Sequence, residues 1–279
     1  MEKFKLENPI PRRRLGKTGV DVTILGLGGE GVLRTHGMGK EAANLISAAL
    51  DLGINYMESA RAYAGSEVYL GEALKGRRDK VFLATKTHAR DKKGALDHLA
   101  ESLSNLKTDH LDLWYLHDMR TMEELEQAIA PGGALDAFKE AKDKGLVKFL
   151  GVSGHEDPVV IRKCIESFDF DVALVPVNPA EPHHKCFLEE VAPAAGRRDV
   201  GLVGMKVYLR GRIEAPKKLL FNYALTQPIS VAVIGCDDVE QLNENAGIAS
   251  TFFNLKQREV QRLSEIIAPY ARELMYYKS

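Results

Sequence analysis

The sequence alternates along its length between short apolar runs, typical of β-strands, and longer amphipathic stretches, typical of helices. The apolar runs carry β-branched and large apolar side chains without strict alternation, which indicates strands buried on both faces. Eight such runs occur, at residues 22–27, 54–57, 81–85, 111–116, 147–152, 172–177, 201–205 and 230–234. Strands of this kind, each followed by a helix, predict an α/β fold in which the sheet closes on itself, a (β/α)8 TIM barrel.

Helical periodicity recurs between these runs. In residues 42–50 the apolar side chains repeat at helical spacing, and Gly53 follows as a stop signal. Further helices are expected at residues 67–75, 96–106, 134–144, 159–168, 186–195, 217–226 and 239–250. We also expect an N-terminal β-hairpin over residues 12–21, closing the barrel bottom, and an extra C-terminal helix over residues 255–277. A barrel of this kind takes about 250 residues, so one domain accounts for residues 1–279.

Composition indicates a protein that acts on a small ligand. The formal net charge is −1, from 38 basic and 39 acidic residues, which gives no case for nucleic acid or an anionic membrane as partner. Residues 1–10 lack the apolar stretch of a signal peptide, and no run approaches the roughly 18 apolar residues of a membrane span, so we expect a soluble cytoplasmic protein. The three scattered cysteines fit no metal or disulfide framework, and no metal is expected. Nothing in the sequence indicates an oligomeric state.

Four ionisable side chains follow three successive strands of the predicted barrel. Glu58 and Tyr63 lie just past the second run, Lys86 ends the third and His117 ends the fourth. Parallel barrel strands present their C-terminal ends to one functional face, and neighbouring strands lie about 4.8 Å apart, so these side chains are expected to converge at one rim. A phenol has a pKa of about 10, which a nearby ammonium lowers. The set is therefore typical of a site that transfers a proton.

Several stretches, taken in order, resemble the aldo-keto reductases, barrel enzymes that reduce aldehydes and ketones with NAD(P)H. The similar stretches are RRLGKTGVDVTILGLGG, INYMESARAYAGSE, ATK ending the third strand, DLWYLH ending the fourth, KEAKDKGLVKFLGVSGH and VIGCDDVEQLNEN. Each motif alone is weakly specific, but their order and spacing cover nearly the whole chain. The resemblance implies reduction of a small carbonyl substrate by hydride transfer from NAD(P)H, a reductant that no side chain can replace.

The resemblance implies a role for each of the four residues Glu58, Tyr63, Lys86 and His117, which we call the rim set. Tyr63 resembles the family's proton donor, Lys86 the group that lowers the pKa of that phenol, and His117 the partner of the substrate carbonyl. Glu58 stands where the family usually has Asp. Its extra methylene shifts the carboxylate by roughly 1 Å, and a misplacement of that size can cost about 100-fold in a tight site, so its contact with Lys86 is expected to need adjustment.

The same resemblance assigns the cofactor side of the rim. The residues implied to contact the nucleotide are Gly29, Ser153, Asn178, Lys206, Gly235, Gln241, Glu244 and Asn245. Gly154 stands where an amide residue is common, Val175 where Gln is common, and Lys206 near the usual stacking tyrosine. Asp237 and Asp238 would repel a 2′-phosphate, so the cofactor is NADPH, the family's default, or NADH. The family's long C-terminal loop is short or absent here, which predicts an open pocket.

Other interpretations of the same residues stay open. Residues 26–31 spell the GxGxxG of a dinucleotide-binding Rossmann fold, but two further glycines follow where that fold needs a helix, so they are expected to form a rim loop. Lys86 or Lys206 could instead form a Schiff base with a carbonyl substrate in a barrel lyase. A third interpretation is a reductase-like protein that binds a nucleotide with weak or no turnover.

Overall fold

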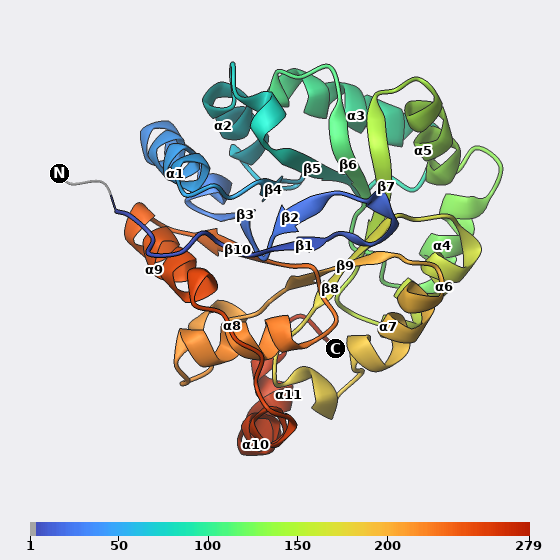
Figure 1. The fold of residues 1–279 in the computed structure, drawn as a ribbon. Helices are drawn as coiled ribbons and strands as arrows, with labels where there is room; N and C mark the ends of the chain where they lie inside the picture. The colour runs from blue at the N-terminus through green and yellow to red at the C-terminus, as the bar shows by residue number, and fades with distance from the viewer. Residues whose placement is uncertain (1–3) are drawn as a thin grey trace.

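The computed structural model describes residues 4–279, and within them eight parallel strands close into a barrel. The strands follow one another around the barrel in sequence order, and the last pairs with the first (Figure 1). They are β3 (Leu25–Gly31), β4 (Tyr56–Glu58), β5 (Phe82–Thr87), β6 (Leu111–Leu116), β7 (Val147–Ser153), β8 (Val172–Pro176), β9 (Gly201–Met205) and β10 (Val231–Cys236). The predicted (β/α)8 barrel is confirmed. One domain over residues 1–279 stays a prediction, and residues 1–3 lie outside the described part.

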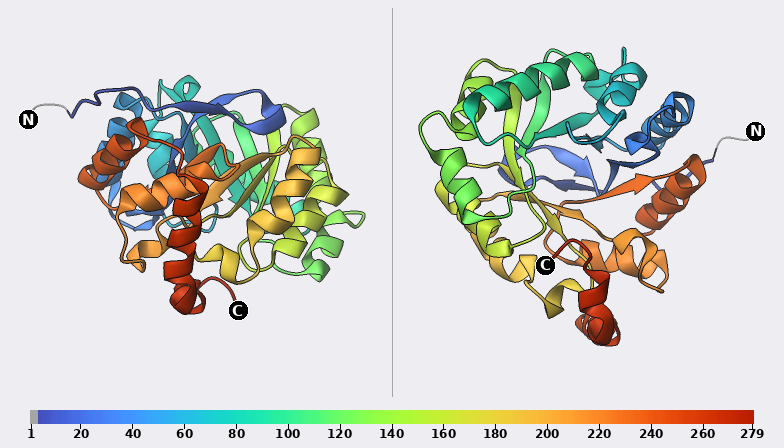
Figure 2. Two further views of the ribbon diagram at one scale, coloured as in Figure 1. Left: turned by 60° about the horizontal axis from the view of Figure 1, so that its bottom comes forward. Right: turned by 180° about the vertical axis from the view of Figure 1, so that it is seen from behind.

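Helices follow the strands and pack around the outside of the barrel (Figures 1 and 2). They are α1 (Gly39–Asp51), α2 (Ser66–Ala73), α3 (Lys92–Leu106), α5 (Ala134–Asp143), α6 (Pro158–Ser167), α7 (Phe187–Arg197), α8 (Lys217–Thr226) and α9 (Val239–Ser250). Apolar stripes face the strands, as in α1, where Leu45 and Ile46 are fully buried. The predicted helices differ from these at their ends. None of the helices within residues 4–279 has the combined length and apolar character that crossing a bilayer requires.

A short hairpin lies across the end of the barrel at which the strands begin (Figure 1). It consists of β1 (Arg12–Arg14) and β2 (Asp21–Thr23), connected through the short helix η1 (Gly16–Thr18). Leu15 is fully buried among side chains of the barrel interior. Gly16 packs so closely on the start of β9 that a Cβ there would lie 2.2 Å from the nitrogen of Gly201. The predicted hairpin therefore closes the barrel bottom.

The apolar run at residues 22–27 was predicted to form one strand, but it belongs to two. Residues 26–31, expected to form a rim loop, lie in the second of these strands, β3. Val22 pairs with Arg13 inside the hairpin, whereas β3 begins at Leu25 and pairs from there with β10. Between them the N–H of Ile24 donates to the carbonyl oxygen of Pro11 at 2.9 Å. The chain bends at this point while both sides of the bend stay buried, which is why the apolar pattern continues through it.

The helical layer differs from the prediction in two places. The helix expected over residues 255–277 is divided into α10 (Gln257–Ile267), η6 (Ala268–Tyr270) and α11 (Ala271–Leu274). Pro269 lacks an amide hydrogen and its ring obstructs the preceding turn, so a continuous helix does not pass through it. An additional helix, α4 (Met122–Ile129), lies between β6 and α5, and the Thr121 side chain caps it by accepting from the N–H of Glu124.

The barrel interior is filled by aliphatic side chains together with a few aromatic rings. Tyr56 of β4 and Tyr115 of β6 are fully buried, and their hydroxyl oxygens lie 2.8 Å apart in a hydrogen bond. Glycines make room for both rings: a Cβ at Gly26 would lie 2.8 Å from Tyr56, and one at Gly151 would lie 2.4 Å from Tyr115. With the interior packed and the bottom closed, the accessible face of the barrel is the rim at the C-terminal ends of the strands.

Candidate active site

The four predicted rim residues come from three adjacent strands. Glu58 ends β4, and Lys86 lies in β5 two residues beyond Ala84, the register partner of Glu58. His117 directly follows the last residue of β6, and Tyr63 lies in the turn between β4 and α2. Because these strands are parallel neighbours, their ends meet at the same rim. The structure therefore brings all four side chains together.

Lys86 and Glu58 form a buried ion pair. The ammonium of Lys86 lies 3.0 Å from Oε1 of Glu58 and also donates to the carbonyl oxygen of Ser59 at 2.8 Å. The two side chains are 1% and 6% exposed. Burial pulls the pKa of Lys86 down, but Glu58 and neighbouring groups outweigh it and hold the pKa above its usual value. Lys86 is therefore a fixed positive charge at neutral pH, and the longer Glu58 side chain still reaches it.

Tyr63 lies beside this pair, with its ring centroid 5.0 Å from Nζ of Lys86 and 4.8 Å from the guanidinium carbon of Arg34. Gly29 leaves room for the ring, because a Cβ there would lie 3.0 Å from Cδ2 of Tyr63. Burial raises the pKa of Tyr63, Lys86 lowers it and Glu58 raises it further, so that pKa lies above its ordinary value. Lys86 acts in the predicted direction, but burial is the larger effect. The phenol is protonated at neutral pH, which is the form a proton donor needs.

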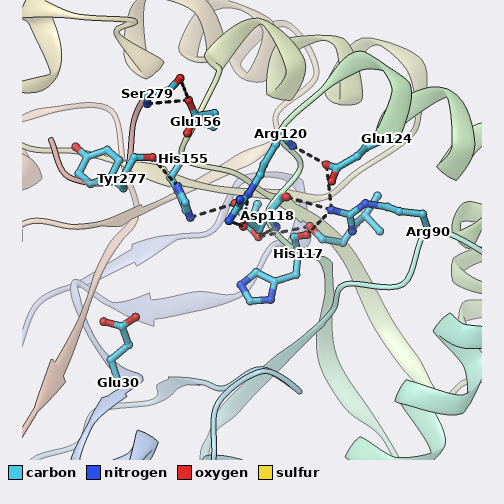
Figure 3. Close-up of polar contacts among 12 residues, drawn as sticks. Glu30, Arg90, His117, Asp118, Arg120, Glu124, His155, Glu156, Tyr277 and Ser279 are labelled. Atoms are coloured by element: carbon cyan, nitrogen blue, oxygen red, sulfur yellow. Dashed lines mark hydrogen bonds and ion pairs between the residues drawn. The ribbon is translucent and has the colours of Figure 1, made fainter.

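The rings of His117 and Tyr63 lie next to each other in a T-shaped arrangement. The two ring centroids lie 5.9 Å apart with the planes at 85°. Burial, and then the positive charge of Lys86, holds the pKa of His117 well below its ordinary value. The imidazole is therefore neutral at neutral pH and presents one N–H donor and one acceptor nitrogen. Arg90 fixes the backbone here by donating to the His117 carbonyl oxygen at 2.9 Å (Figure 3).

A charged network next to His117 was missed by the sequence reasoning. Arg90 also donates to the carbonyl oxygen of Asp118 at 3.0 Å and to the Glu124 carboxylate at 3.2 Å. Asp118 in turn lies 3.1 Å from Nε2 of His155 (Figure 3). Arg90, Asp118 and His155 come from the separate loops after β5, β6 and β7, and Glu124 lies in the first turn of α4. No periodicity or motif connects such positions along the chain, so only the folded barrel places them side by side.

Ser153, a predicted nucleotide contact, ends β7 with its hydroxyl buried. Its oxygen accepts a hydrogen bond from the backbone N–H of Asp118 at 3.1 Å. The departure from the family's pattern at the next residue, Gly154, has a steric cause. A Cβ there would lie 2.5 Å from Cδ1 of Ile161 and 2.7 Å from the carbonyl oxygen of Met119. An amide side chain does not fit at this position.

Asn178 and Lys206, also predicted to contact the nucleotide, are covered by residues from the far end of the sequence. Nδ2 of Asn178 donates to the hydroxyl of Tyr277 at 2.9 Å and to the carbonyl oxygen of Lys206 at 3.3 Å. The ammonium of Lys206 lies 5.6 Å from the ring centroid of Tyr276 and 5.7 Å from that of Tyr277. The expected open pocket is therefore wrong on this side of the rim. The sequence carried no signal for this, because both tyrosines fell inside the predicted C-terminal helix.

The other predicted nucleotide contacts lie together where β10 meets α9. Each of them already makes a contact within the protein: Gly235 with Glu30, Gln241 with Asp237, Glu244 with Lys217, and Asn245 with Tyr208. Asp238 caps α9 by accepting from the N–H of Gln241 at 2.7 Å, so its structural role is visible without a ligand. The structure brings these residues to one edge of the rim, and their contact with a nucleotide stays a prediction.

Burial keeps the thiols of two cysteines protonated. Across residues 4–279, no group of three or more His, Cys, Asp or Glu side chains is placed to hold a metal ion. The cysteines are free, and burial raises the pKa of Cys164 to about 12 and that of Cys236 to about 11. Thiols with such pKa values are protonated at neutral pH and unreactive as nucleophiles.

Solved structures of aldo-keto reductases share this fold. AKR11C1 from Bacillus halodurans, in its holo form, matches with a TM-score of 0.79 at 22% sequence identity, over 92% of this chain and 96% of that one. An aldo-keto reductase from Klebsiella pneumoniae in complex with NADPH matches with a TM-score of 0.74 at 19% identity, over 94% and 96% of the two chains. At these identities the likeness shows the fold.

Sequence relatives point to the same family. Two of them come from Bacillus subtilis (strain 168): "Uncharacterized oxidoreductase YqkF", 29% identical over 172 residues, and "Aldo-keto reductase YhdN", 30% identical over 195 residues. The alignments cover 56% and 63% of this chain but 52% and 54% of the relatives, so the chain spans about half the length of the curated relatives it matches. Residues 25–218, more than half of the chain, match the sequence pattern of the family described as "Aldo/keto reductase family". The chain therefore belongs to the aldo/keto reductase family.

Proposed function

We propose that the protein reduces a small aldehyde or ketone by hydride transfer from NADPH or NADH, with Tyr63 as the proton donor. The observation that carries the proposal is the buried Lys86–Glu58 ion pair beside the protonated phenol of Tyr63, whose ring the neutral His117 also faces. Membership of the aldo/keto reductase family supports the same class of reaction.

The rim residues supply the proton and stabilise the charge that its transfer leaves. Reduction places negative charge on the carbonyl oxygen, and Tyr63 donates its proton to that oxygen. Lys86 then stabilises the phenolate that remains, since an ammonium nearby favours the charged form of a phenol. The neutral imidazole of His117 donates its N–H to the same oxygen and orients the carbonyl. General acid catalysis of this kind contributes about 10²- to 10⁴-fold.

The cofactor, when bound, supplies the hydride that no side chain can donate. The donor set at one edge of the rim fits an anionic dinucleotide, because Lys206, Arg210 and Arg34 gather there around Glu30. Burial raises the pKa of Glu30, but the surrounding cations outweigh it and hold that pKa below its usual value. This excess of positive charge suits phosphate groups. Gly29, Ser153 and Asn178 are the proposed contacts near the nicotinamide, and Gly235, Gln241, Glu244 and Asn245 those at the adenosine end.

The choice between the two nucleotides depends on the start of α9. Asp237 and Asp238 hold two carboxyl groups beside Gln241, at the proposed adenosine end, and their negative charge opposes that of a 2′-phosphate. The proposal therefore includes NADH beside NADPH, although the K. pneumoniae neighbour was solved in complex with NADPH. Separate titrations with the two nucleotides, followed by nicotinamide fluorescence, measure the preference.

The proton-donor role is tested by Tyr63→Phe. We expect kcat for reduction of small aldehydes and ketones to fall by at least about 100-fold, while the affinity for NADPH stays unchanged. Tyr270→Phe is the matched control, because that ring is 61% exposed on η6, and it should keep full activity. A Tyr63→Phe enzyme with wild-type kcat would refute the mechanism.

The two alternatives drawn from the sequence are not favoured. A Schiff base needs a neutral amine, and the ion pair with Glu58 holds the pKa of Lys86 above its usual value, which keeps Lys86 protonated. Burial does lower the pKa of Lys206, but its ammonium lies against the rings of Tyr276 and Tyr277, and membership of the aldo/keto reductase family supports reduction instead. A binding protein without turnover has no need of a buried cation beside a protonated phenol, because burying such a charge costs stability.

A further inference from the structure

Residues 276–279, which we call the strap, lie over the mouth of the barrel. The end of the chain that carries the strap is seen at the barrel opening in the right-hand view of Figure 2. Strap residues contact the loops that follow three strands: His155 and Glu156 after β7, Asn178 and Glu181 after β8, and Lys206 after β9. Figure 3 shows Tyr277 and Ser279 beside the first two of these. The strap therefore covers part of the same rim that holds Tyr63 and Lys86.

Tyr277 is held on three sides. Its hydroxyl accepts from Nδ2 of Asn178 at 2.9 Å and donates to Oε1 of Glu181 at 2.7 Å. Its carbonyl oxygen accepts from Nδ1 of His155 at 3.1 Å. The residue is 6% exposed. Tyr277 is thus packed and hydrogen-bonded like a core residue.

Lys278 fastens the strap through a second buried ion pair. Its ammonium lies 2.8 Å from the Glu181 carboxylate and donates to the carbonyl oxygens of His184 and Lys185 at 2.9 and 2.8 Å. The Lys278 and Glu181 side chains are 0% and 2% exposed. All three N–H groups of the ammonium are used, and its charge also lies 5.0 Å from the ring centroid of Phe187. A surface tail that happened to rest on the barrel would not bury a charged pair in this way.

The strap uses donors that the proposed function needs for the nucleotide. Nδ2 of Asn178 has two hydrogens; one goes to the Tyr277 hydroxyl and the other to the carbonyl oxygen of Lys206. Asn178 can therefore donate nothing to a nicotinamide carboxamide while the strap is in place. The ammonium of Lys206, proposed to meet the phosphates, faces the rings of Tyr276 and Tyr277 instead.

We propose that the strap is a built-in competitor of the nucleotide: it occupies the nicotinamide side of the rim, and NADPH or NADH must displace it. This inference rests on the proposed function, since it concerns the same site. A protein whose binding-competent form is only fractionally populated shows an apparent Kd raised by that fraction. If the strap is closed in about nine of ten molecules, its removal tightens nucleotide binding about 10-fold.

The test compares nucleotide affinity with and without the strap contacts. The variants are a deletion of residues 276–279 and Tyr277→Phe, which keeps the packed ring and frees one hydrogen of Asn178. The matched control is Tyr270→Phe, whose ring is exposed on η6. Titration with NADPH and with NADH, followed by nicotinamide fluorescence, should give a Kd about 10-fold or more lower for the deletion, a smaller decrease for Tyr277→Phe, and no change for the control.

Hydrogen exchange on the wild-type protein gives a readout independent of the variants. Saturating NADPH should speed exchange at the amides of residues 276–279 as the strap leaves the rim. A Kd in the deletion and in Tyr277→Phe equal to or weaker than wild type, or strap amides that stay protected with the nucleotide bound, would overturn the competition and leave the proposed reductase standing. Failure of every variant and of the wild type to bind either nucleotide would overturn both.

Discussion

Replacing Glu58 by Gln tests whether the ion pair next to the proposed proton donor keeps Lys86 charged. The substitution retains the length of the side chain and removes its charge. Lys86, 1% exposed, would be left with the carbonyl oxygen of Ser59 as its other partner. Breaking a buried pair by removing one member costs about 3 to 5 kcal/mol, because the remaining charge stays desolvated without its counterion. We expect that loss in the free energy of unfolding measured with urea.

The same substitution changes the chemistry of the site. Burial lowers the pKa of Lys86, and Glu58 is the largest cause that opposes it, so the pKa of Lys86 should fall in Glu58→Gln. A weaker positive charge stabilises the Tyr63 phenolate less, and we expect kcat to fall by about 100-fold, as when one preorganised charge-stabilising group is removed. Glu58→Asp, which restores the residue usual in the family, keeps the charge and serves as the control with smaller losses in both measurements.

A double variant, Glu58→Gln with Lys86→Met, separates the two effects. Removing both charges takes away the unpaired buried cation, so part of the lost stability should return while the activity stays low. Unfolding of Glu58→Gln within about 1 kcal/mol of wild type, the range of an exposed ion pair, would refute the reasoning about this buried pair.

The pKa of His117 and the packing of Gly154 give two further expectations. Burial and Lys86 hold the pKa of His117 well below 6.5, so below that pH the unfolded chain binds a proton that the folded protein does not, and stability falls as the pH drops. The free energy of unfolding, measured with urea at several pH values, should fall by up to about 1.4 kcal/mol for each pH unit below 6.5. This dependence on pH should be weaker in His117→Asn. An equally steep dependence in the variant would contradict the expectation. Gly154→Ala places a Cβ 2.5 Å from Cδ1 of Ile161 and should cost about 1 to 3 kcal/mol, seen as a lower Tm. Gly196→Ala, where a Cβ meets nothing within 4 Å, is its control and should lose no stability.

The barrel and its rim set could be predicted because both depend on patterns that are local along the chain. The runs at residues 111–116 and 201–205 coincide with β6 and β9, since strands buried on both faces are continuous apolar stretches. Once parallel strands are assigned, the convergence of Lys86 and His117 follows from topology alone. Pro269, where the predicted C-terminal helix is divided, is a local signal as well, because proline interrupts a helix.

The strap and the direction of the Tyr63 pKa could not be predicted in this way. Asn178 and Tyr277 lie 99 positions apart, and the contact between them depends on where the chain travels after α11. The pKa of Tyr63 depends on a balance in which burial exceeds the opposing charge of Lys86. Burial is a property of packing in three dimensions, so residue types alone indicate which groups act on a phenol but not which effect is larger.

The two tyrosines inside the barrel form the floor on which the rim set rests. The ammonium of Lys86 lies 6.0 Å from the ring centroid of Tyr115, whose position depends on the room left by Gly151, its register partner on β7. Any side chain at Gly151 would displace the Tyr115 ring, because a Cβ there would lie 2.4 Å from it. Substitutions in the barrel interior can therefore change the surroundings of Lys86 and Tyr63 while every residue of the rim stays the same. Relatives with identical rim residues need not share the same activity.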